Sequence, residues 1–123
     1  MDINLETHSG MNEIVSYGDN EVVIRTSNNI ELAYNQPLIL SPTDLITNEM
    51  TSIDNDEDIT FLRGLKPEVL IFTNIAASHF PPEIRTKFET DGIGVELMSL
   101  GAACRTYNLL VSEGRKVVLS ICF

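Results

Sequence analysis

The chain has 123 residues, 43% of them hydrophobic, and its eight basic and eighteen acidic residues give a formal net charge of −10. This size and composition predict one globular domain over residues 1–123, and no apolar run approaches the roughly 18 residues of a membrane span. The acidic balance argues against nucleic acid as a partner, because such binding depends on neutralising phosphates. The N-terminus lacks the basic and apolar regions of a signal peptide, so we expect a cytoplasmic protein.

Cysteine and histidine are scarce in this sequence. The two cysteines are Cys104 and Cys122, and the two histidines, His8 and His79, lie far apart along the chain. No spacing among them is typical of a zinc site, and without an export signal a structural disulfide is not expected. We therefore predict no metal and no cofactor.

The first half of the chain predicts antiparallel hairpins. Residues 1–12 are polar and are expected to form a loose N-terminal arm. Asn28 and Asn29 suit a two-residue hairpin turn, because asparagine tolerates a positive φ. Short segments rich in β-branched and apolar residues predict the strands, which are expected at residues 14–17, 21–26, 30–34 and 37–40.

Residues 41–55 form a connection of mixed polarity that leads into an acidic cluster at residues 54–58. This cluster lacks the glycine and the final acid of an EF-hand loop, so a calcium site is not expected. Acidic residues are favourable at a helix N-terminus, and Asp54 suits an N-cap. The pattern predicts a helix that buries Ile59 and Leu62 and ends at Gly64.

The segment from residue 68 to residue 98 predicts a β-α-β unit. Residues 68–73 form a continuous apolar run, which is typical of a strand covered on both faces. Pro81-Pro82 is expected to begin a helix, and Gly92 to end it before a strand at residues 93–98. Such units are almost always parallel and right-handed. The helix is expected to bury Ile84 and Phe88 and to expose a Glu83–Lys87 ion pair.

Residues 92–115 carry the most unusual residues of the sequence. A glycine turn at Gly101 is expected to lead into a helix over residues 102–113, with Gly114 as its stop and a last strand at residues 116–121. At about 100° per residue, one helix face packs on the sheet and the other is polar. The packing face is Ala103, Tyr107, Leu110 and Val111; the opposite face is Arg105, Asn108 and Ser112, interrupted by Leu109, with Cys104 at the edge.

Two interpretations of this helix remain open. In the first, backbone N–H groups at its N-terminus and Arg105 bind an anion, and Cys104 is an activated nucleophile of a small-molecule enzyme. In the second, Cys104 is a small buried residue, Gly101 is small because of close packing, and the outer face binds another protein. No histidine lies nearby in sequence to act as a base. This favours the second interpretation.

The segments Gly92–Met98, Gly101–Asn108 and Glu113–Arg115 resemble the Mth-like domain of unknown function. The Ala-Ala-Cys-Arg-Thr-Tyr-Asn stretch at residues 102–108 is the specific part, and the likeness spans about residues 12 to 122. Relatives include an animal adipogenesis-associated protein and a mitochondrial assembly factor of NADH:ubiquinone oxidoreductase, complex I. The resemblance implies a three-layer α/β fold with a mixed central sheet. Its N-terminal half would form β-hairpins and its C-terminal half a β-α-β-α-β unit.

The function expected from this resemblance is a non-enzymatic binding or assembly module, and the mitochondrial relative implies a relation to respiratory complex I assembly. Its partner would be a protein, with neither its identity nor the oligomeric state defined by the sequence. We expect the binding residues to be Gly101, Arg105, Asn108, Leu109 and Ser112. Since arginine near a helix N-terminus opposes the helix dipole, Arg105 is expected to have a compensating partner, by default an internal carboxylate.

Overall fold

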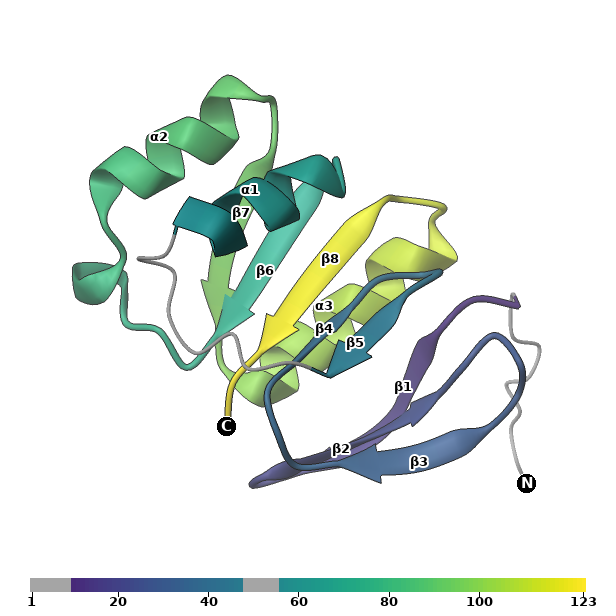
Figure 1. The fold of residues 1–123 in the computed structure, drawn as a ribbon. Helices are drawn as coiled ribbons and strands as arrows, with labels where there is room; N and C mark the ends of the chain where they lie inside the picture. Colours follow the sequence, from purple (N-terminus) through teal and green to yellow (C-terminus); the bar gives the residue numbers. More distant parts are fainter. Residues whose placement is uncertain (1–9, 48–55) are drawn as a thin grey trace.

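The computed structural model describes residues 10–47 and 56–123 (Figure 1). Its helices are α1 (Asp56–Gly64), α2 (Pro82–Thr90) and α3 (Leu100–Ser112), with a short 3₁₀ turn at Ala77–His79. Its strands are β1 (Glu13–Gly18), β2 (Glu21–Arg25), β3 (Glu31–Tyr34), β4 (Leu38–Leu40), β5 (Leu45–Thr47), β6 (Val69–Thr73), β7 (Gly94–Met98) and β8 (Val117–Ile121).

The strands form two sheets. The larger has the order β5-β4-β8-β6-β7, in which β7 and β8 run parallel to β6 while β4 is antiparallel to both β5 and β8. The smaller is the antiparallel sheet β1-β2-β3. The predicted α/β fold is therefore confirmed, with hairpins in the first half and a parallel β-α-β-α-β unit in the second.

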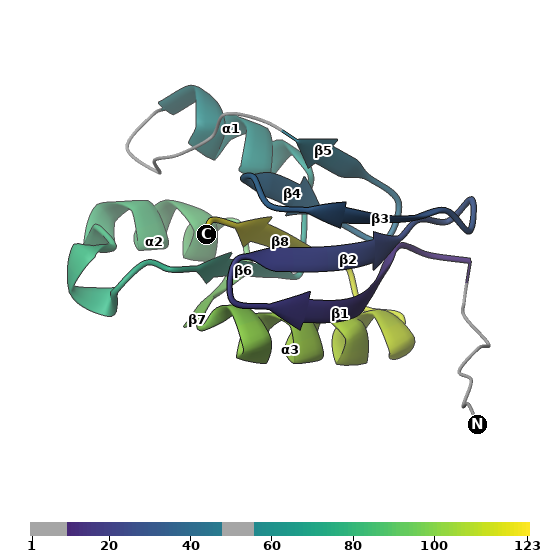
Figure 2. The same ribbon diagram turned by 90° about the horizontal axis from the view of Figure 1, so that it is seen from below.

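Helices cover both faces of the larger sheet. Figure 2 shows α1 and α2 on one side and α3 on the other, with β1 lying beside α3. Side chains of a strand point alternately to the two faces, so Ile39 packs toward α1 and α2 while Leu38 and Leu40 pack toward α3. Both packing layers are apolar, which explains why β6 and β8 consist mostly of apolar residues.

The hairpin between β2 and β3 has a longer loop than predicted. Thr26 N–H donates to the Ile30 carbonyl at 2.9 Å, which leaves three residues, Ser27 to Asn29, in the loop. Asn29 has φ of 66°. This geometry belongs to the three-residue class, whose last residue adopts the left-handed region. The predicted two-residue turn was wrong in length but right about asparagine at a positive φ.

The chain is firmly held from Asn12 onward, although the predicted loose arm extended to this residue. Asn12 is buried, its side chain donates to the Ser41 carbonyl and accepts from Ser27 N–H, and its carbonyl accepts from the Tyr107 hydroxyl. These contacts link the N-terminal segment to α3. The rest of the predicted arm, residues 1–9, and the predicted N-cap Asp54 lie outside the described residues.

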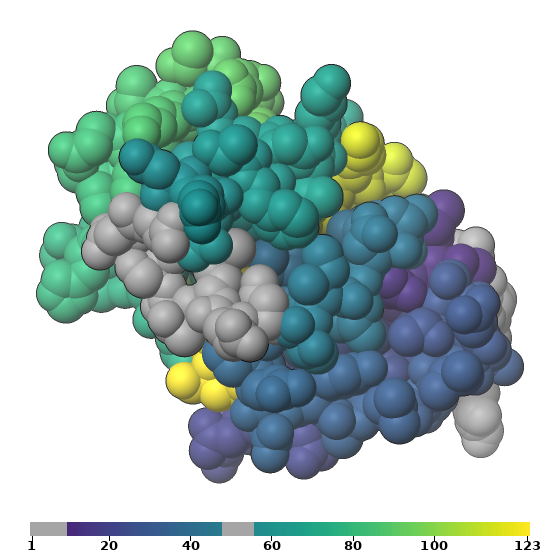
Figure 3. All heavy atoms as spheres, viewed as in Figure 1, coloured from purple at the N-terminus to yellow at the C-terminus, as the bar shows by residue number. Residues whose placement is uncertain are grey.

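Two local predictions were wrong. No strand was expected within residues 41–55, but Leu45–Thr47 forms β5 at the sheet edge. The expected Glu83–Lys87 pair does not form: Arg85 pairs with Glu89, and the Lys87 ammonium lies 3.8 Å from the Asp56 carboxylate on α1. The space-filling view in Figure 3 shows α1 and α2 next to each other on one face of the molecule.

Helix α3 begins two residues earlier than predicted, at Leu100. Ser99 is its N-cap, and the Ser99 hydroxyl accepts a hydrogen bond from Ala102 N–H. Gly101 therefore lies in the first helical turn and does not form the predicted glycine turn. Arg105 moves into the second turn, where opposition from the helix dipole is weaker. The predicted end is confirmed, with Gly114 at φ of 76°.

Candidate functional site

Arg105 of α3 contacts Tyr17 of β1. The Arg105 guanidinium donates to the Tyr17 hydroxyl, and its central carbon lies 6.0 Å from the centre of the Tyr17 ring. Within the described part of the chain, Arg105 has no carboxylate at ion-pair distance, so the expected internal carboxylate is replaced by an aromatic hydroxyl. The guanidinium keeps its charge exposed at the surface.

Gly101 makes room for this contact. A Cβ atom at residue 101 would lie 2.9 Å from the Tyr17 ring and 3.3 Å from the Arg105 guanidinium. Both approaches are closer than carbon and nitrogen atoms normally allow, so any larger residue would displace the ring. The small residue predicted for close packing thus packs against an aromatic side chain of β1.

Asn108 was predicted on the outer face, but its side chain is used internally. The Asn108 side-chain amide donates to the Ile14 carbonyl at 2.8 Å and accepts from Ile14 N–H at 3.0 Å. A free polar contact for a partner is therefore not available there. Asn108 instead holds β1 against α3 and so fixes the surface that Tyr17 and Arg105 share.

Exposed apolar side chains lie on the same two elements as the Tyr17–Arg105 pair. Leu109 is 57% exposed, and Val15 and Tyr17 are 43% and 42% exposed. A shallow groove of about 360 Å³, lined in part by Val15, Tyr17 and Arg105, lies between β1 and α3. Ser112 is also exposed, and its hydroxyl donates to the Leu109 carbonyl. We call this area the β1–α3 surface; it consists of Val15, Tyr17, Arg105, Leu109 and Ser112.

Cys104 lies inside the molecule and not at the edge of the helix face as predicted. Its side chain is 1% exposed and packs with Ala103 and Tyr107. Burial raises the pKa of the thiol from 9.0 to about 11, although the nearby Arg105 charge opposes this shift. A thiolate nucleophile needs a lowered pKa and access to solvent. The geometry therefore argues against the enzyme interpretation based on Cys104.

The remaining titratable side chains do not converge on this surface. In the described ranges 10–47 and 56–123, no three His, Cys, Asp or Glu side chains lie together so as to hold a metal ion. His79 lies in the exposed 3₁₀ turn before α2. The sequence analysis missed Tyr17 and Val15, because their strand is brought beside α3 only by the fold. The one signal in the sequence that another element lies close to α3 was Gly101, a glycine within a helical pattern.

The family of the chain follows from its sequence match. The model of a family described as "Protein of unknown function (DUF498/DUF598)" matches residues 14–122. The chain belongs to this family. A solved structure from Bordetella pertussis, described as a Mth938-like domain, superposes with a TM-score of 0.68 at 21% identity, over 99% of this chain and 92% of that one. The fold is therefore that of the Mth-like domain, as the resemblance implied.

Two other similar proteins have names that mention membranes. A protein of Francisella tularensis named "13 kDa major membrane protein" is 34% identical over 90 residues, which are 68% of this chain and 72% of that protein. A crystal structure described as an outer membrane protein from Bartonella henselae has a TM-score of 0.70 and 26% identity, over 92% of this chain and 95% of that one. In the part of this chain that the structure describes, no helix has the length and apolarity to cross a membrane.

Proposed function

We propose that this protein is a non-enzymatic binding or assembly module that holds a protein partner on the β1–α3 surface. The exposure of Leu109 carries this proposal. Ala103, Cys104, Tyr107 and Val111 already supply the buried face of α3, yet Leu109 leaves 57% of its surface in contact with water. Because just over half of Leu109 is still exposed, burying the rest at an interface gains roughly 1–1.5 kcal/mol before the costs of association.

The other residues of the β1–α3 surface include the types that are common at the centre of an interface. Tyrosine and arginine are enriched among the residues that contribute most to protein binding, and here Tyr17 and Arg105 are already in contact. Because β1 is fixed to α3 through Asn108, the surface is formed before a partner arrives. A preformed surface loses less conformational entropy on binding. Arg105 would meet an acidic side chain or a carbonyl group of the partner.

A narrower proposal comes from the resemblance to a complex I assembly factor. The partner would then be a subunit or an assembly intermediate of respiratory complex I. Blue native electrophoresis of membranes from cells that lack this protein tests it directly. The proposal predicts less mature complex I and more subcomplex; an unchanged pattern would remove complex I and leave the general binding role intact.

The cytoplasmic location expected from the sequence is also a proposal. The relatives named as membrane proteins are compatible with it if the module is bound to the cytoplasmic side of a membrane-embedded partner. Cell fractionation tests whether the β1–α3 surface holds the protein at the membrane. Wild-type protein should sediment with membranes, while a variant with a disrupted β1–α3 surface should appear in the cytosol. Sedimentation of both would mean that another feature holds the protein at the membrane.

Affinity capture tests the binding role. The variant Arg105→Gln/Leu109→Gln removes the charge and the apolar group from the β1–α3 surface but keeps good helix formers. The matched control is Thr86→Gln on the exposed side of α2. Capture followed by mass spectrometry should recover a partner with wild-type and control protein and lose it with the double variant. Equal recovery from all three would contradict the proposed surface.

A further inference from the structure

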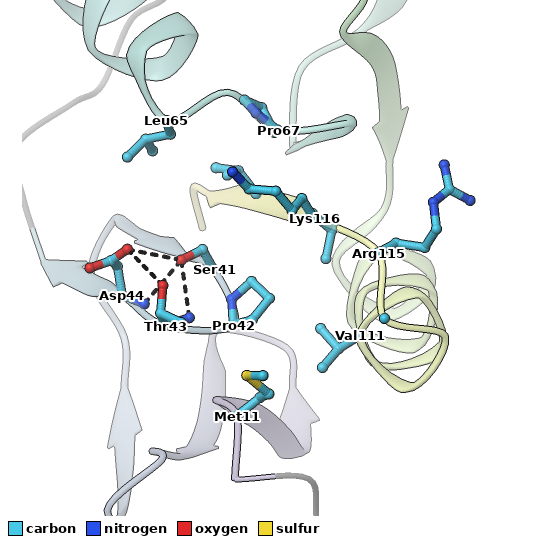
Figure 4. Close-up of a pocket in the computed structure, with 13 residues that line it drawn as sticks. Met11, Ser41, Pro42, Thr43, Asp44, Leu65, Pro67, Val111, Arg115 and Lys116 are labelled. Carbon is cyan, nitrogen blue, oxygen red and sulfur yellow. Dashed lines mark hydrogen bonds between the residues drawn. The ribbon is translucent and has the colours of Figure 1, made fainter.

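A second cavity lies at the C-terminal end of α3, away from the β1–α3 surface and sharing none of its residues (Figure 4). It has a volume of about 310 Å³ and is bounded by Met11, the loop of residues 41–44, the turn of residues 65–67 and the start of β8. At about 30 Å³ for each water, this space would hold roughly ten waters. It is at the lower end of the range for small-molecule sites, about 300–1,000 Å³.

The cavity has apolar walls contributed by segments far apart in sequence. Met11, Leu65, Pro67 and Val111 line it, and Figure 4 shows them surrounding the central space. Pro67 and Val111 are buried, and Leu65 is half-buried, so these walls are held by the core. Water beside such walls is easily displaced by a hydrocarbon group. The cavity thus favours a ligand with an apolar body.

The loop at one edge of the cavity is rigid. Ser41 is buried, its hydroxyl oxygen accepts from Asp44 N–H at 3.0 Å, and its N–H donates to the Asp44 carbonyl at 2.8 Å. The Asp44 carboxylate in turn accepts from the hydroxyls of Ser41 and Thr43. These bonds keep one negative charge at a fixed place on the rim. This edge of the cavity is therefore preorganised for a ligand.

One positive charge at the cavity, that of the exposed Lys116, acts on Glu68 at longer range but does not form an ion pair with it. Across the chain that the structure describes, Lys116 has no acidic group at ion-pair distance. Its neighbour Glu68 accepts from Arg115 Nε at 2.9 Å and from the backbone N–H of Lys116 at 3.1 Å. In Figure 4 the Lys116 side chain extends over the cavity, while the Arg115 guanidinium points away from it.

We propose that this cavity binds a small carboxylic acid with an apolar body. The Lys116 ammonium group holds the carboxylate, and the hydrocarbon part lies against Met11, Leu65 and Val111. A carboxylate and an ammonium form a strong, charge-assisted hydrogen bond. Asp44 on the rim, in a chain of net charge −10, repels ligands with several negative charges. The site is therefore selective for a monoanion and excludes nucleotides and polyphosphates.

A titration with sodium octanoate, followed by the backbone amide signals of ¹⁵N-labelled protein, tests this proposal. Octanoate should shift the signals of residues around the cavity in a saturable way, while octylammonium should not and octan-1-ol should bind at least about tenfold more weakly. Shifts that do not saturate, shifts confined to the β1–α3 surface, or equal binding of all three probes would overturn the proposal.

Two variants isolate the contribution of the Lys116 charge. Lys116→Gln should weaken octanoate binding about tenfold or more, because one charge-assisted hydrogen bond is lost. Lys66→Gln removes an exposed neighbouring charge whose residue does not line the cavity, and it should change the affinity less than about threefold. Equal losses in both variants would mean that the general charge of this region attracts octanoate, which contradicts a specific role of Lys116. Partner capture on the β1–α3 surface is a separate readout and should be unchanged in both.

Discussion

Asn108 of α3 forms two hydrogen bonds with the backbone of Ile14 in β1, donating to its carbonyl at 2.8 Å and accepting from its N–H at 3.0 Å. The side-chain amide thus takes the place that a neighbouring strand would have at this edge of the small sheet. The two residues are 94 positions apart in the sequence. This contact joins the three-stranded sheet to the helix that covers the larger sheet.

We predict that Asn108→Ala lowers the free energy of unfolding by about 1–3 kcal/mol, because two partly buried backbone groups of Ile14 lose their partner. Urea denaturation measures this change. The control Ser112→Ala, on the exposed side of the same helix, should stay within about 0.5 kcal/mol of wild type. Equal stability of Asn108→Ala and wild type would mean that water replaces the amide at no cost.

The sequence predicted the helices and strands well but not the role of Asn108. Periodicity placed Asn108 on the face opposite Ala103 and Tyr107, and this was correct for the helix itself. It did not show that β1 lies against that side, because a contact over 94 residues leaves no local pattern. β5 was missed for a similar reason: three residues at a sheet edge are too few to show alternation.

We predict that Gly101→Ala moves the Tyr17 ring away from Arg105 without unfolding the protein. A Cβ at residue 101 would lie 2.9 Å from the ring, and Tyr17 is exposed enough to turn aside. Alanine is favoured over glycine in helices by about 0.8–1 kcal/mol, which offsets the lost contact, so stability should change by less than about 1 kcal/mol. The ring proton signals of Tyr17 in NMR spectra report the movement.

Partner capture with Gly101→Ala provides a second measurement on the same variant. If Tyr17 and Arg105 bind the partner as a pair, Gly101→Ala should recover less of the partner. This loss is expected although Gly101 is not one of the residues that form the β1–α3 surface. Unchanged Tyr17 ring signals would contradict the close contact at Gly101. Changed ring signals with full capture would remove Tyr17 from the proposed interface.

We predict that Cys104 reacts slowly with iodoacetamide in the folded protein. Its pKa of about 11 leaves only about one thiol in a thousand ionised at pH 8, and the side chain is 1% exposed. Cys122, which is partly exposed, is an internal comparison and should be labelled faster. Mass spectrometry of peptides from native and urea-unfolded protein gives both rates. Native labelling of Cys104 faster than unfolded labelling would restore the nucleophile interpretation.

The same thiol predicts a loss of stability at alkaline pH. Folding raises its pKa from 9.0 to about 11, so the folded state favours the protonated form. The resulting stabilisation is complete below about pH 9 and is lost as the pH rises through 11. Burial also raises the pKa of Tyr107, which acts in the same direction. Urea denaturation between pH 8 and 11 should show a smaller decline in Cys104→Ala; equal declines would contradict this account.

The cavity beside Lys116 was beyond prediction from the sequence. Its walls come from Met11, residues 41–44, Leu65, Pro67, Val111 and residues 114–118, and in each segment the residues look like ordinary loop, helix or strand positions. Lys116 was expected only as the first residue of the last strand. That its ammonium group is left out of the ion pair became visible when the fold placed Glu68 with Arg115. Such a site depends on tertiary packing, which a single sequence does not display.

The most direct test of the β1–α3 surface as a protein-binding site is photo-crosslinking in living cells. Leu109 is replaced by the photoreactive residue benzoylphenylalanine, and Thr86 on α2 is replaced in the same way as the matched position. The account predicts a discrete crosslinked product of higher mass from position 109, absent from position 86 and lost when Arg105→Gln is added. No product from position 109, or the same products from both positions, would contradict it.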